Sequence, residues 1–557
     1  MTARRQPAAK RRALPAAAIF LILFASLWLL HLPLLGLPYF WDEAGYFIPA
    51  ARDILLTGDL IPHTTLSNAH PPLVMLWLAA CWKLFTYTPV VTRTAMLLVA
   101  AFGFTALWLL ARRVSDAQVA TATVTLTALS PVIYSQSAMA QLDIAAFALV
   151  LWTLYAYLCE RRWMAIFFAA LAAVAKETTV AVTLTLAAVD LLCWIAGRCK
   201  PGLAPEGGAR TLRQAQGRLR GTVLPGTLAE RWELPRRTLA QCLAWLLALV
   251  PLVAWYAYHF HRTGHVFGNP DYLRYNVGST VTPLRIALSF LLRLWHVAGY
   301  MNLFVLTAAA LLLLWDSRRG GRPANAGGAP PIAAKVRLLL LLVVLAQVAE
   351  FSIVGGALLA RYMVAAIPLV ILLSVDLIRR YAPEWTWWIA GCAVAFVVAL
   401  FFNPPWFISP EDNLTWVHFV EMHQQAARYV ERHYPDQRIL TAWSASDELN
   451  RPFLGYTTRP LTVVRIENFS IEEILRAAQQ PDSFDAVVAF STKFEPPRSF
   501  FRIPNSTEIM TRYYDFHQDL PAAAIAHVLH GRIVWQASSP GEWIAVIEID
   551  KIRLAKR

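Results

Sequence analysis

The chain has few charged residues for its length, and this scarcity excludes most soluble folds. Of its 557 residues only 15% are Asp, Glu, Lys or Arg, whereas 57% are hydrophobic. The mean hydropathy is +0.45. Apolar runs recur between residues 13 and 402, and many approach the length of about 20 residues that crosses a bilayer. The composition predicts an α-helical polytopic membrane protein.

Cysteine is equally sparse, with six residues in the whole chain and none after Phe401. Disulfides therefore do not hold the C-terminal region together. The cysteines form no CxxC pair and no Cys/His spacing typical of a metal site. The sequence thus indicates no cofactor, while a divalent metal at a site built from other residues stays open as an alternative.

Acidic residues are fewer than basic ones, 36 against 50, which gives a formal net charge of +14. Such a balance can indicate a nucleic-acid-binding protein. Here, however, the basic residues lie between apolar runs, where Lys and Arg anchor loops on the cytoplasmic side of a membrane. We therefore expect no nucleic-acid partner.

Charge also predicts the topology. Basic residues precede the first apolar run, 13–37, which is long for a signal peptide and lacks a good cleavage site. We expect an uncleaved helix with a cytoplasmic N-terminus. The apolar segment 71–85 is short and starts with Pro-Pro. If it lies in the outer interface and does not cross the membrane, the later basic loops fall on the cytoplasmic side, as the positive-inside rule requires. About eleven crossings follow: 13–37, 91–110, 117–134, 144–159, 163–175, 180–196, 239–258, 302–315, 336–353, 364–378 and 385–402.

Three further segments complete the expected organisation. Residues 38–90 form an outer loop, and residues 197–237, rich in Gly, Pro and Arg, form a cytoplasmic linker. In residues 282–299, Arg285, Arg293 and His296 share one helical face, which suits an interfacial helix. After the membrane domain, 1–404, residues 405–557 alternate helical and strand-like runs. They predict a soluble α/β domain on the extracytoplasmic side.

Polar residues gather on the same predicted outer side. They are Asp42 and Glu43 after the first helix, with His70, Asp143, Lys176, Glu177, Arg361 and Tyr362. Charge beside membrane helices is costly, so such a cluster suggests a functional site. A carboxylate there could take a proton from an acceptor hydroxyl. Cations could stabilise a departing lipid phosphate.

Five short stretches occur in one order: WDEAGY, AHPPL, the Asp of AQLDIAAF, AKETT and ARYMVAAIPLV. They resemble the landmarks of GT-C-fold glycosyltransferases of the protein O-mannosyltransferase type, whose bacterial relatives include lipid A aminoarabinose transferases. The resemblance covers roughly residues 13–405. It departs from the mannosyltransferases at HPPLVM, which lacks their Gly-Lys, and in lacking a repeated β-trefoil domain. Both differences argue against mannose and against protein acceptors.

The resemblance implies an inverting transfer at the outer face of the plasma or inner membrane. The donor would be a polyprenyl-phosphate sugar, and the acceptor a hydroxyl on a protein, lipid or glycan. By matching motif, Asp42 would be the general base beside Glu43. Arg361 would hold the lipid phosphate, with His70, Lys176 and Tyr362 near it. Asp143 and Glu177, within the matched motifs, would have supporting roles. Outside the motifs, His261 and Arg262 are further candidates for support, because the histidines at 259, 261 and 265 suit contact with a phosphate or headgroup at least as well as a metal cluster. No metal ligand is assigned.

Each of these residues also has a purely structural interpretation. The acids at 42 and 43 could cap an interfacial helix. Asp143 could be a helix N-cap, which we favour over contact with a metal or the acceptor. Lys176 and Glu177 could form a local ion pair in a tight turn. Arg361 could be an anchor that extends its charge to the membrane surface.

A second class of function also fits a polytopic chain, namely a transporter or flippase of lipid-linked sugars. Transporters of this kind show internal repeats, broken helices and polar groups near the bilayer midplane. The sequence shows no clear repeat, and its polar motifs lie at one face, followed by a sizeable outer domain. These features favour the enzyme.

Overall fold

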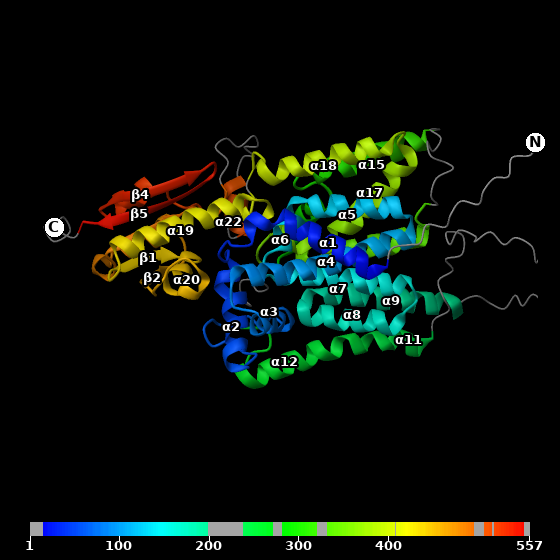
Figure 1. Ribbon diagram of the computed structural model, residues 1–557, viewed down its shortest axis with the longest axis horizontal. Helices are drawn as coiled ribbons and strands as arrows, with labels where there is room; N and C mark the ends of the chain where they lie inside the picture. Colours follow the sequence, from blue (N-terminus) through cyan, green and yellow to red (C-terminus); the bar gives the residue numbers. More distant parts are fainter. Residues whose placement is uncertain are drawn as a thin grey trace, which may run out of the picture.

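The computed structural model describes residues 15–198, 238–270, 281–319, 331–406, 408–494, 506–514 and 517–550. The expected linker at 197–237 lies, from residue 199 onward, outside the described residues. Two parts are visible, a bundle of apolar helices and a smaller α/β unit at one end of it (Figure 1). The two parts contact each other along the end of the bundle where the site residues lie.

The bundle contains the segments expected from the apolar runs. Its helices are α1 (Ala16–Leu30), α2 (Ile48–Thr57), α3 (Leu73–Leu84), α4 (Pro89–Val114), α5 (Ala117–Leu129), α6 (Pro131–Ser137), α7 (Leu142–Leu158), α8 (Arg162–Ala175), α9 (Val180–Arg198), α11 (Leu239–Leu243), α12 (Val250–Thr263), α14 (Pro283–Ala298), α15 (Leu303–Arg318), α16 (Ala334–Ile353), α17 (Ile367–Tyr381) and α18 (Trp385–Phe401). Short 3-10 or π turns join them: η1 (Leu32–Leu34), η2 (Glu43–Phe47), η3 (Glu177–Thr179), η5 (Ala244–Leu249) and η7 (Ala360–Met363).

The helices vary in length. Among the described residues, four spans are long and apolar enough to cross a membrane, or six if each bent pair counts as one span. Five more apolar helices are shorter, α1 and α3 among them. The expected count of about eleven crossings therefore remains a prediction.

One expected crossing, 117–134, is broken in two. Helices α5 and α6 meet at an angle of 74° on either side of Ser130. The cause is Pro131, which has no backbone N–H to continue the helical hydrogen bonds and whose ring obstructs the preceding turn. A second bent pair, α14 and α15, meets at 84°. The break at Pro131 lets the chain turn toward the end of the bundle that carries the site.

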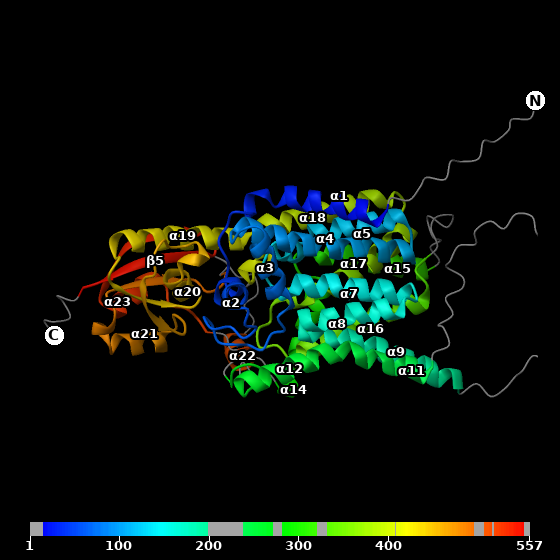
Figure 2. The same cartoon turned by 60° about the horizontal axis from the view of Figure 1, so that its bottom comes forward.

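Helix α3 lies beside α2 at the end of the bundle nearest the α/β unit (Figures 1 and 2). Before it, His70 pairs with Glu177, and after it the Tyr87 hydroxyl donates to the Phe453 carbonyl of the α/β unit at 2.8 Å. Both ends of α3 thus contact residues on the same side of the bundle. Its 12 residues span only about 18 Å.

The C-terminal unit carries five strands among its helices, in keeping with the alternating strand-like and helical runs of residues 405–557. Its elements are η8 (Pro410–Asp412), α19 (Thr415–His433), β1 (Arg438–Ala442), α20 (Ala445–Asn450), η9 (Pro452–Leu454), β2 (Thr462–Ile466), α21 (Ile471–Ala478), η10 (Pro481–Ser483), β3 (Ala486–Phe490), α22 (Ser506–Tyr514), α23 (Ala522–Val528), β4 (Gly531–Ser539) and β5 (Glu542–Ile549).

These strands form one sheet in the order β2-β1-β3-β5-β4. Strand β1 is parallel to β2 and β3, while β5 is antiparallel to β3 and β4. The amphipathic helix α19 buries Trp416 together with Phe419 and Val420. The latter two follow Trp416 by three and four residues, the spacing of a stripe that faces the core. Helix α19 leads from the bundle into the sheet, and a single large core continues across the two parts.

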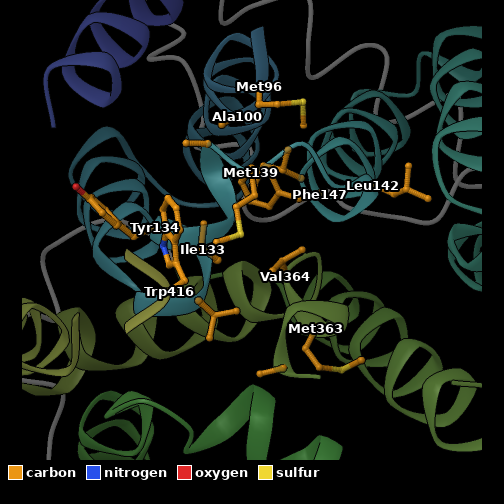
Figure 3. Packing of buried hydrophobic residues seen from close by; sticks show 14 of the residues in the cluster. Met96, Ala100, Ile133, Tyr134, Met139, Leu142, Phe147, Met363, Val364 and Trp416 are labelled. Carbon is orange, nitrogen blue, oxygen red and sulfur yellow. The ribbon is translucent and has the colours of Figure 1, made fainter. Parts of the chain in front are cut away.

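Figure 3 draws part of that core, including Met139, Phe147, Val364 and Trp416, which come from four separate segments. Trp416 belongs to α19, whereas the other three belong to the bundle. All four side chains are buried. The α/β unit is thus packed into the bundle core rather than tethered to it.

Candidate active site

The WDEAGY stretch forms an irregular turn that separates its two acids. Trp41 has a φ of 46°, in the left-handed region, and residues 43–47 then form a π-helical turn before α2. The Asp42 side chain is 29% exposed and lines a large cavity, whereas that of Glu43 is fully buried. The turn therefore directs adjacent carboxylates into opposite environments.

Glu43, expected as a catalytic neighbour of Asp42, is held by the surrounding protein. Its carboxylate accepts hydrogen bonds from the backbone N–H of Phe40 at 2.9 Å and of Ala140 at 2.6 Å. It also pairs with the fully buried guanidinium of Arg93 on α4, at 3.3 Å. It does not line the cavity. Through these contacts, Glu43 links the turn to α4 and to the start of α7.

Arg361 stands at the centre of the site, on the short turn η7. It forms an ion pair with Asp42 and another with Glu411, 2.8 Å away, and its Nε lies 3.8 Å from Asp143. Gln141 accepts a further hydrogen bond from it and donates to Glu411 at 3.3 Å. Asp42 and Arg361, predicted as base and phosphate ligand, are thus in direct contact.

The loop before Arg361 is held by arginines of α14. Arg293 donates to the carbonyls of Ala357 at 3.0 Å and Leu359 at 2.6 Å, and Arg285 donates to that of Gly356 at 2.9 Å. The two arginines share a face, as expected, and that face is buried in protein. Their side chains therefore fix the backbone that leads to Arg361.

Lys176 is the second cation of the site. It pairs with Asp143, on the first turn of α7, and not with its neighbour Glu177. Its ammonium also lies 4.4 Å from the ring centre of Tyr362, within the range of a cation–π contact. Tyr362 in turn stacks on Phe351 at 5.0 Å. Asp143 makes no N-cap hydrogen bond, so its carboxylate faces the two cations.

His70 and Glu177 form a second pair on the cavity wall, with Nδ1 and Oε1 3.2 Å apart. The His70 ring packs against Tyr46 and Phe47, with ring centres 5.7 and 5.9 Å away. These two aromatic residues follow Asp42 in the same turn. His70 therefore supports the turn and contributes an imidazole ring to the cavity wall.

His261 and Arg262, expected as supporting residues, lie outside the cavity on the exposed face of α12. Arg262 pairs there with Asp59 at 2.6 Å. The buried His259 does line the cavity and contacts the Ser67 hydroxyl at 2.7 Å. Within the described part of the chain, no three or more His, Cys, Asp or Glu side chains are arranged to hold a metal ion.

Four residues of the site region were not anticipated. Glu411 and Trp443 come from beyond the bundle, and nothing in the local sequence links them to a turn near residue 42. Gln141 is next to the expected Asp143 motif but carries no charge to mark it. Arg93 had a visible signal, because a basic residue within an apolar run is uncommon and usually functional or paired.

The positive and negative charges in the cluster around Arg361 are not equal in number. Arg361 and Lys176 face Asp42, Asp143 and Glu411, so the cluster carries one excess negative charge when every group is ionised. An incoming anion would meet Arg361 already neutralised by carboxylates. Binding of an anion therefore requires that one carboxylate move away or take up a proton.

Glu411 is the carboxylate suited to take up that proton. Burial raises its pKa to about 7, although the charge of Arg361 acts in the opposite direction. Burial also raises the pKa of Asp412, the next residue, to about 6, against a hydrogen bond from Tyr300. Burial lowers the pKa of the Arg361 guanidinium. The negative charges of the surrounding carboxylates have a larger effect in the opposite direction, so that this pKa is raised overall. Arg361 thus stays charged while Glu411 titrates.

The cavity is large, about 2820 Å³, and is shared by the two parts of the molecule. Its bundle side includes Asp42, His70, Lys176 and Arg361. Its other side is made by the C-terminal unit, including Trp443, whose ring lies 5.0 Å from that of Trp41. A pocket for one drug-sized ligand measures about 300–1,000 Å³. The cavity therefore has room for two reactants.

Comparison with solved structures identifies the fold. The chain superposes on a crystal structure of ArnT from Cupriavidus metallidurans bound to undecaprenyl phosphate, with a TM-score of 0.53 and 15% identity. The alignment covers 95% of this chain and 97% of that one. The apo state of the same protein gives a TM-score of 0.49 at 15% identity, covering 96% and 98%. The fold is therefore GT-C-like, as the motifs predicted.

A more distant match is the oligosaccharyltransferase of Archaeoglobus fulgidus in complex with Zn and sulfate. Its TM-score is 0.42 at 11% identity, covering 85% of this chain and 68% of that one. No protein-family model matches the chain, and no curated protein matches its sequence. The likeness to solved structures thus concerns the fold, and function has to be argued from the site.

Proposed function

We propose that this protein is an inverting glycosyltransferase that moves a sugar from a polyprenyl-phosphate donor to an acceptor hydroxyl. One observation carries the proposal: a partly exposed carboxylate, Asp42, touches a buried cation, Arg361, on the wall of a cavity large enough for two substrates. The GT-C-like fold and the undecaprenyl phosphate bound to ArnT support a lipid phosphate as the donor's carrier.

Asp42 would act as the general base. As the acceptor hydroxyl attacks the anomeric carbon, its proton passes to the Asp42 carboxylate, so that the attacking oxygen does not become positively charged. The partly exposed position of Asp42 gives an acceptor access to it. The deeply buried Glu43 would instead hold the turn in place through Arg93.

Arg361 would bind the leaving group. When the bond between the anomeric carbon and the phosphate oxygen breaks, the polyprenyl phosphate gains negative charge, and a fixed guanidinium stabilises that charge. Because Arg361 already contacts Asp42, donor binding would draw the cation toward the phosphate and release the base. A single displacement of this kind inverts the anomeric centre.

The remaining predicted residues would serve this arrangement. Lys176 and Asp143 form a pair next to Arg361, and Tyr362 covers both cations with its ring. His70 would lie near the donor phosphate on the cavity wall. We propose that the cavity opens on the outer face of a cell membrane, with the N-terminus cytoplasmic and the C-terminal domain, 405–557, extracytoplasmic.

The decisive experiment compares wild type with Asp42→Asn in the purified, full-length protein. A radiolabelled polyprenyl-phosphate sugar is supplied, and both release of the lipid phosphate and transfer to acceptor extracts are measured. We expect the variant to lose activity by a factor of about 100 or more, the usual contribution of a general base. Asp436→Asn, at an exposed position after α19, is the matched control and should keep full activity.

Thermal unfolding of each variant separates lost chemistry from lost fold. Equal activity of wild type and Asp42→Asn would remove Asp42 as the base. Movement of intact lipid-linked sugar across a membrane without its cleavage would favour the transporter instead.

A further inference from the structure

The C-terminal unit builds half of the cavity from the ends of its parallel strands. Trp443 and Asp447 follow β1, Asn468 follows β2, and Lys493 follows β3. All four line the same cavity as Asp42. Residues far apart in this part of the chain are therefore brought to one edge of the sheet, on the cavity that Asp42 also lines.

The strand order explains why a site forms at this edge. The chain passes from β1 to β2 on one side, then crosses to β3 on the other side of β1. The connections that follow β1 and β3 therefore lead to strands on opposite sides of this pair, β2 on one side and β4 and β5 on the other. In open α/β sheets, ligands bind at such a reversal of the strand order, outside the carboxyl ends of the parallel strands.

The side chains along this edge carry both signs of charge and one aromatic ring. Arg465 at the end of β2 is exposed, and Arg476 on α21 is 67% exposed in its side chain and pairs with Glu473. Asp447 pairs with Arg451 at 3.3 Å. We name this surface the strand-end wall and define it by six residues: Trp443, Asp447, Arg465, Asn468, Arg476 and Lys493.

We propose that the strand-end wall binds the acceptor and that the acceptor is a carbohydrate. The inference rests on the proposed glycosyl transfer and names the substrate of its second half. A sugar presents hydroxyl groups that donate to carboxylates and accept from guanidinium and amide groups. Its C–H face is apolar and packs against an aromatic ring such as Trp443.

The position of Trp443 ties the strand-end wall to the base. Its ring lies edge-to-face with Trp41, next to Asp42, at 5.0 Å. It also covers Gly45 so closely that a Cβ there would lie 2.6 Å from the indole. A sugar ring resting on Trp443 would therefore present its hydroxyls to the turn that carries Asp42.

A peptide acceptor fits this surface less well. In one common mode of peptide binding, an extended peptide adds a strand to an exposed sheet edge, and pockets for its alternate side chains give specificity. Five of the six residues of the strand-end wall instead carry a charged or amide group, and they surround strand ends. Recognition by many polar contacts around one ring is the arrangement that a hydroxyl-rich ligand needs.

Binding can be tested without any transfer. Full-length protein in lipid nanodiscs, with no donor present, is mixed with N,N′-diacetylchitobiose or with a serine- and threonine-rich peptide. Saturation-transfer NMR then reports which of the two molecules contacts the protein. We expect transfer to the ring protons of the disaccharide, at least threefold weaker in Arg465→Gln. Arg428→Gln, at an exposed site on α19 outside the cavity, should match wild type.

The outcomes separate this inference from the proposed function. No signal from the disaccharide, an unchanged signal in Arg465→Gln, or a signal from the peptide alone would overturn carbohydrate binding at the strand-end wall. Cleavage of donor that depends on Asp42, measured on the same samples, tests glycosyl transfer independently. Donor cleavage without disaccharide binding would therefore refute only the acceptor proposal, and binding without donor cleavage would refute only the transfer.

Discussion

At the scale of single residues, Asp42 and Glu43 differ more than their adjacency suggests. Neighbours on a helical turn point about 100° apart, so one can face a cavity while the other faces the core. Asp42 meets Arg361 at the cavity, and Glu43 meets Arg93 where neither is exposed. The first carboxylate is available for chemistry, and the second is committed to holding the turn.

Replacing Glu43 should therefore cost stability. Glu43→Gln leaves the Arg93 guanidinium buried without a counter-charge, and breaking a buried ion pair destabilises a protein by about 3–5 kcal/mol. We expect a clear fall in the thermal unfolding midpoint of the solubilised protein. The control is Glu548→Gln, which removes an exposed pair with Arg532 and should change stability by less than about 0.5 kcal/mol. Equal stability of both variants would contradict the structural role of Glu43.

Glu411 predicts how donor affinity depends on pH. With a pKa of about 7, its carboxyl is mostly neutral below that value and ionised above it. Protonation removes the excess negative charge around Arg361, whereas the donor phosphodiester keeps one negative charge throughout. Donor KM should therefore fall as the pH is lowered from about 8 to about 6, by at most about tenfold per pH unit because one proton is linked.

Glu411→Gln isolates this effect, because glutamine is neutral at every pH. Its donor KM should be low and nearly independent of pH over the same range. Glu421→Gln, at an exposed position on α19, should keep the wild-type profile. A pH-independent KM in wild type, or an unchanged slope in Glu411→Gln, would show that Glu411 does not control phosphate binding.

At the scale of elements, the sequence predicts helices and strands that have a local periodic pattern. It does not predict features that depend on contacts between distant segments. Apolar runs marked most helices, and alternating patterns marked the C-terminal unit as a mixture of strands and helices, because periodicity is a local property. Arg285 and Arg293 also lie on one face of α14, as the sequence predicted. The burial of this face could not be anticipated, because it depends on the carbonyls of a loop some 70 residues away, such as that of Gly356. Glu411 joins Arg361 for the same reason, through a fold that no local pattern records.

The turn that carries Asp42 should be sensitive to one methyl group. In Gly45→Ala, the new Cβ would lie 2.6 Å from the Trp443 indole, so the turn or the ring has to move. We expect destabilisation by about 1–3 kcal/mol and a lower kcat, because the base is displaced. Gly391→Ala is the control, since nothing lies within 4 Å of its Cβ on α18 and alanine favours a helix.

A second substitution tests whether Trp443 causes the effect. Trp443→Phe makes the ring smaller where it meets Gly45. The double variant should therefore be less destabilised than the sum of the two single variants, with a coupling of about 1 kcal/mol or more. Strict additivity would place the effect of Gly45→Ala elsewhere in the turn.

At the scale of the whole molecule, the proposed reaction centre is built by both parts of the chain. Asp42 and Arg361 come from the bundle, whereas Glu411 and Trp443 come from the segment after α18. The Tyr456 hydroxyl also donates to the Tyr39 carbonyl at 3.0 Å, just before the Asp42 turn. The α/β unit thus completes the site, and a bundle without it would lack one partner of Arg361.

The same geometry also supports a prediction of where the chain crosses a membrane. Both ends of α3 lie on the cavity side of the bundle. Before the helix, His70 contacts Glu177, and after it, Tyr87 donates a hydrogen bond to the Phe453 carbonyl. The α3 length of about 18 Å is also well short of the roughly 30 Å hydrocarbon core. Helix α4 has 26 residues, about 39 Å, and ends at Arg112 and Arg113 far from the cavity. We therefore predict that α4, and not α3, makes the second crossing.

Single cysteines in a cysteine-free background test this topology with a membrane-impermeant maleimide on intact cells. Leu66→Cys, before α3, and Lys83→Cys, in its last turn, are both at exposed positions and should be labelled from outside. Arg112→Cys should be labelled only after the membrane is permeabilised. If Lys83→Cys were protected and Arg112→Cys labelled, α3 would be a crossing helix, and each basic loop after it would change sides. The positive-inside bias would then be reversed along most of the chain, which is why this pair of positions separates the two topologies most sharply.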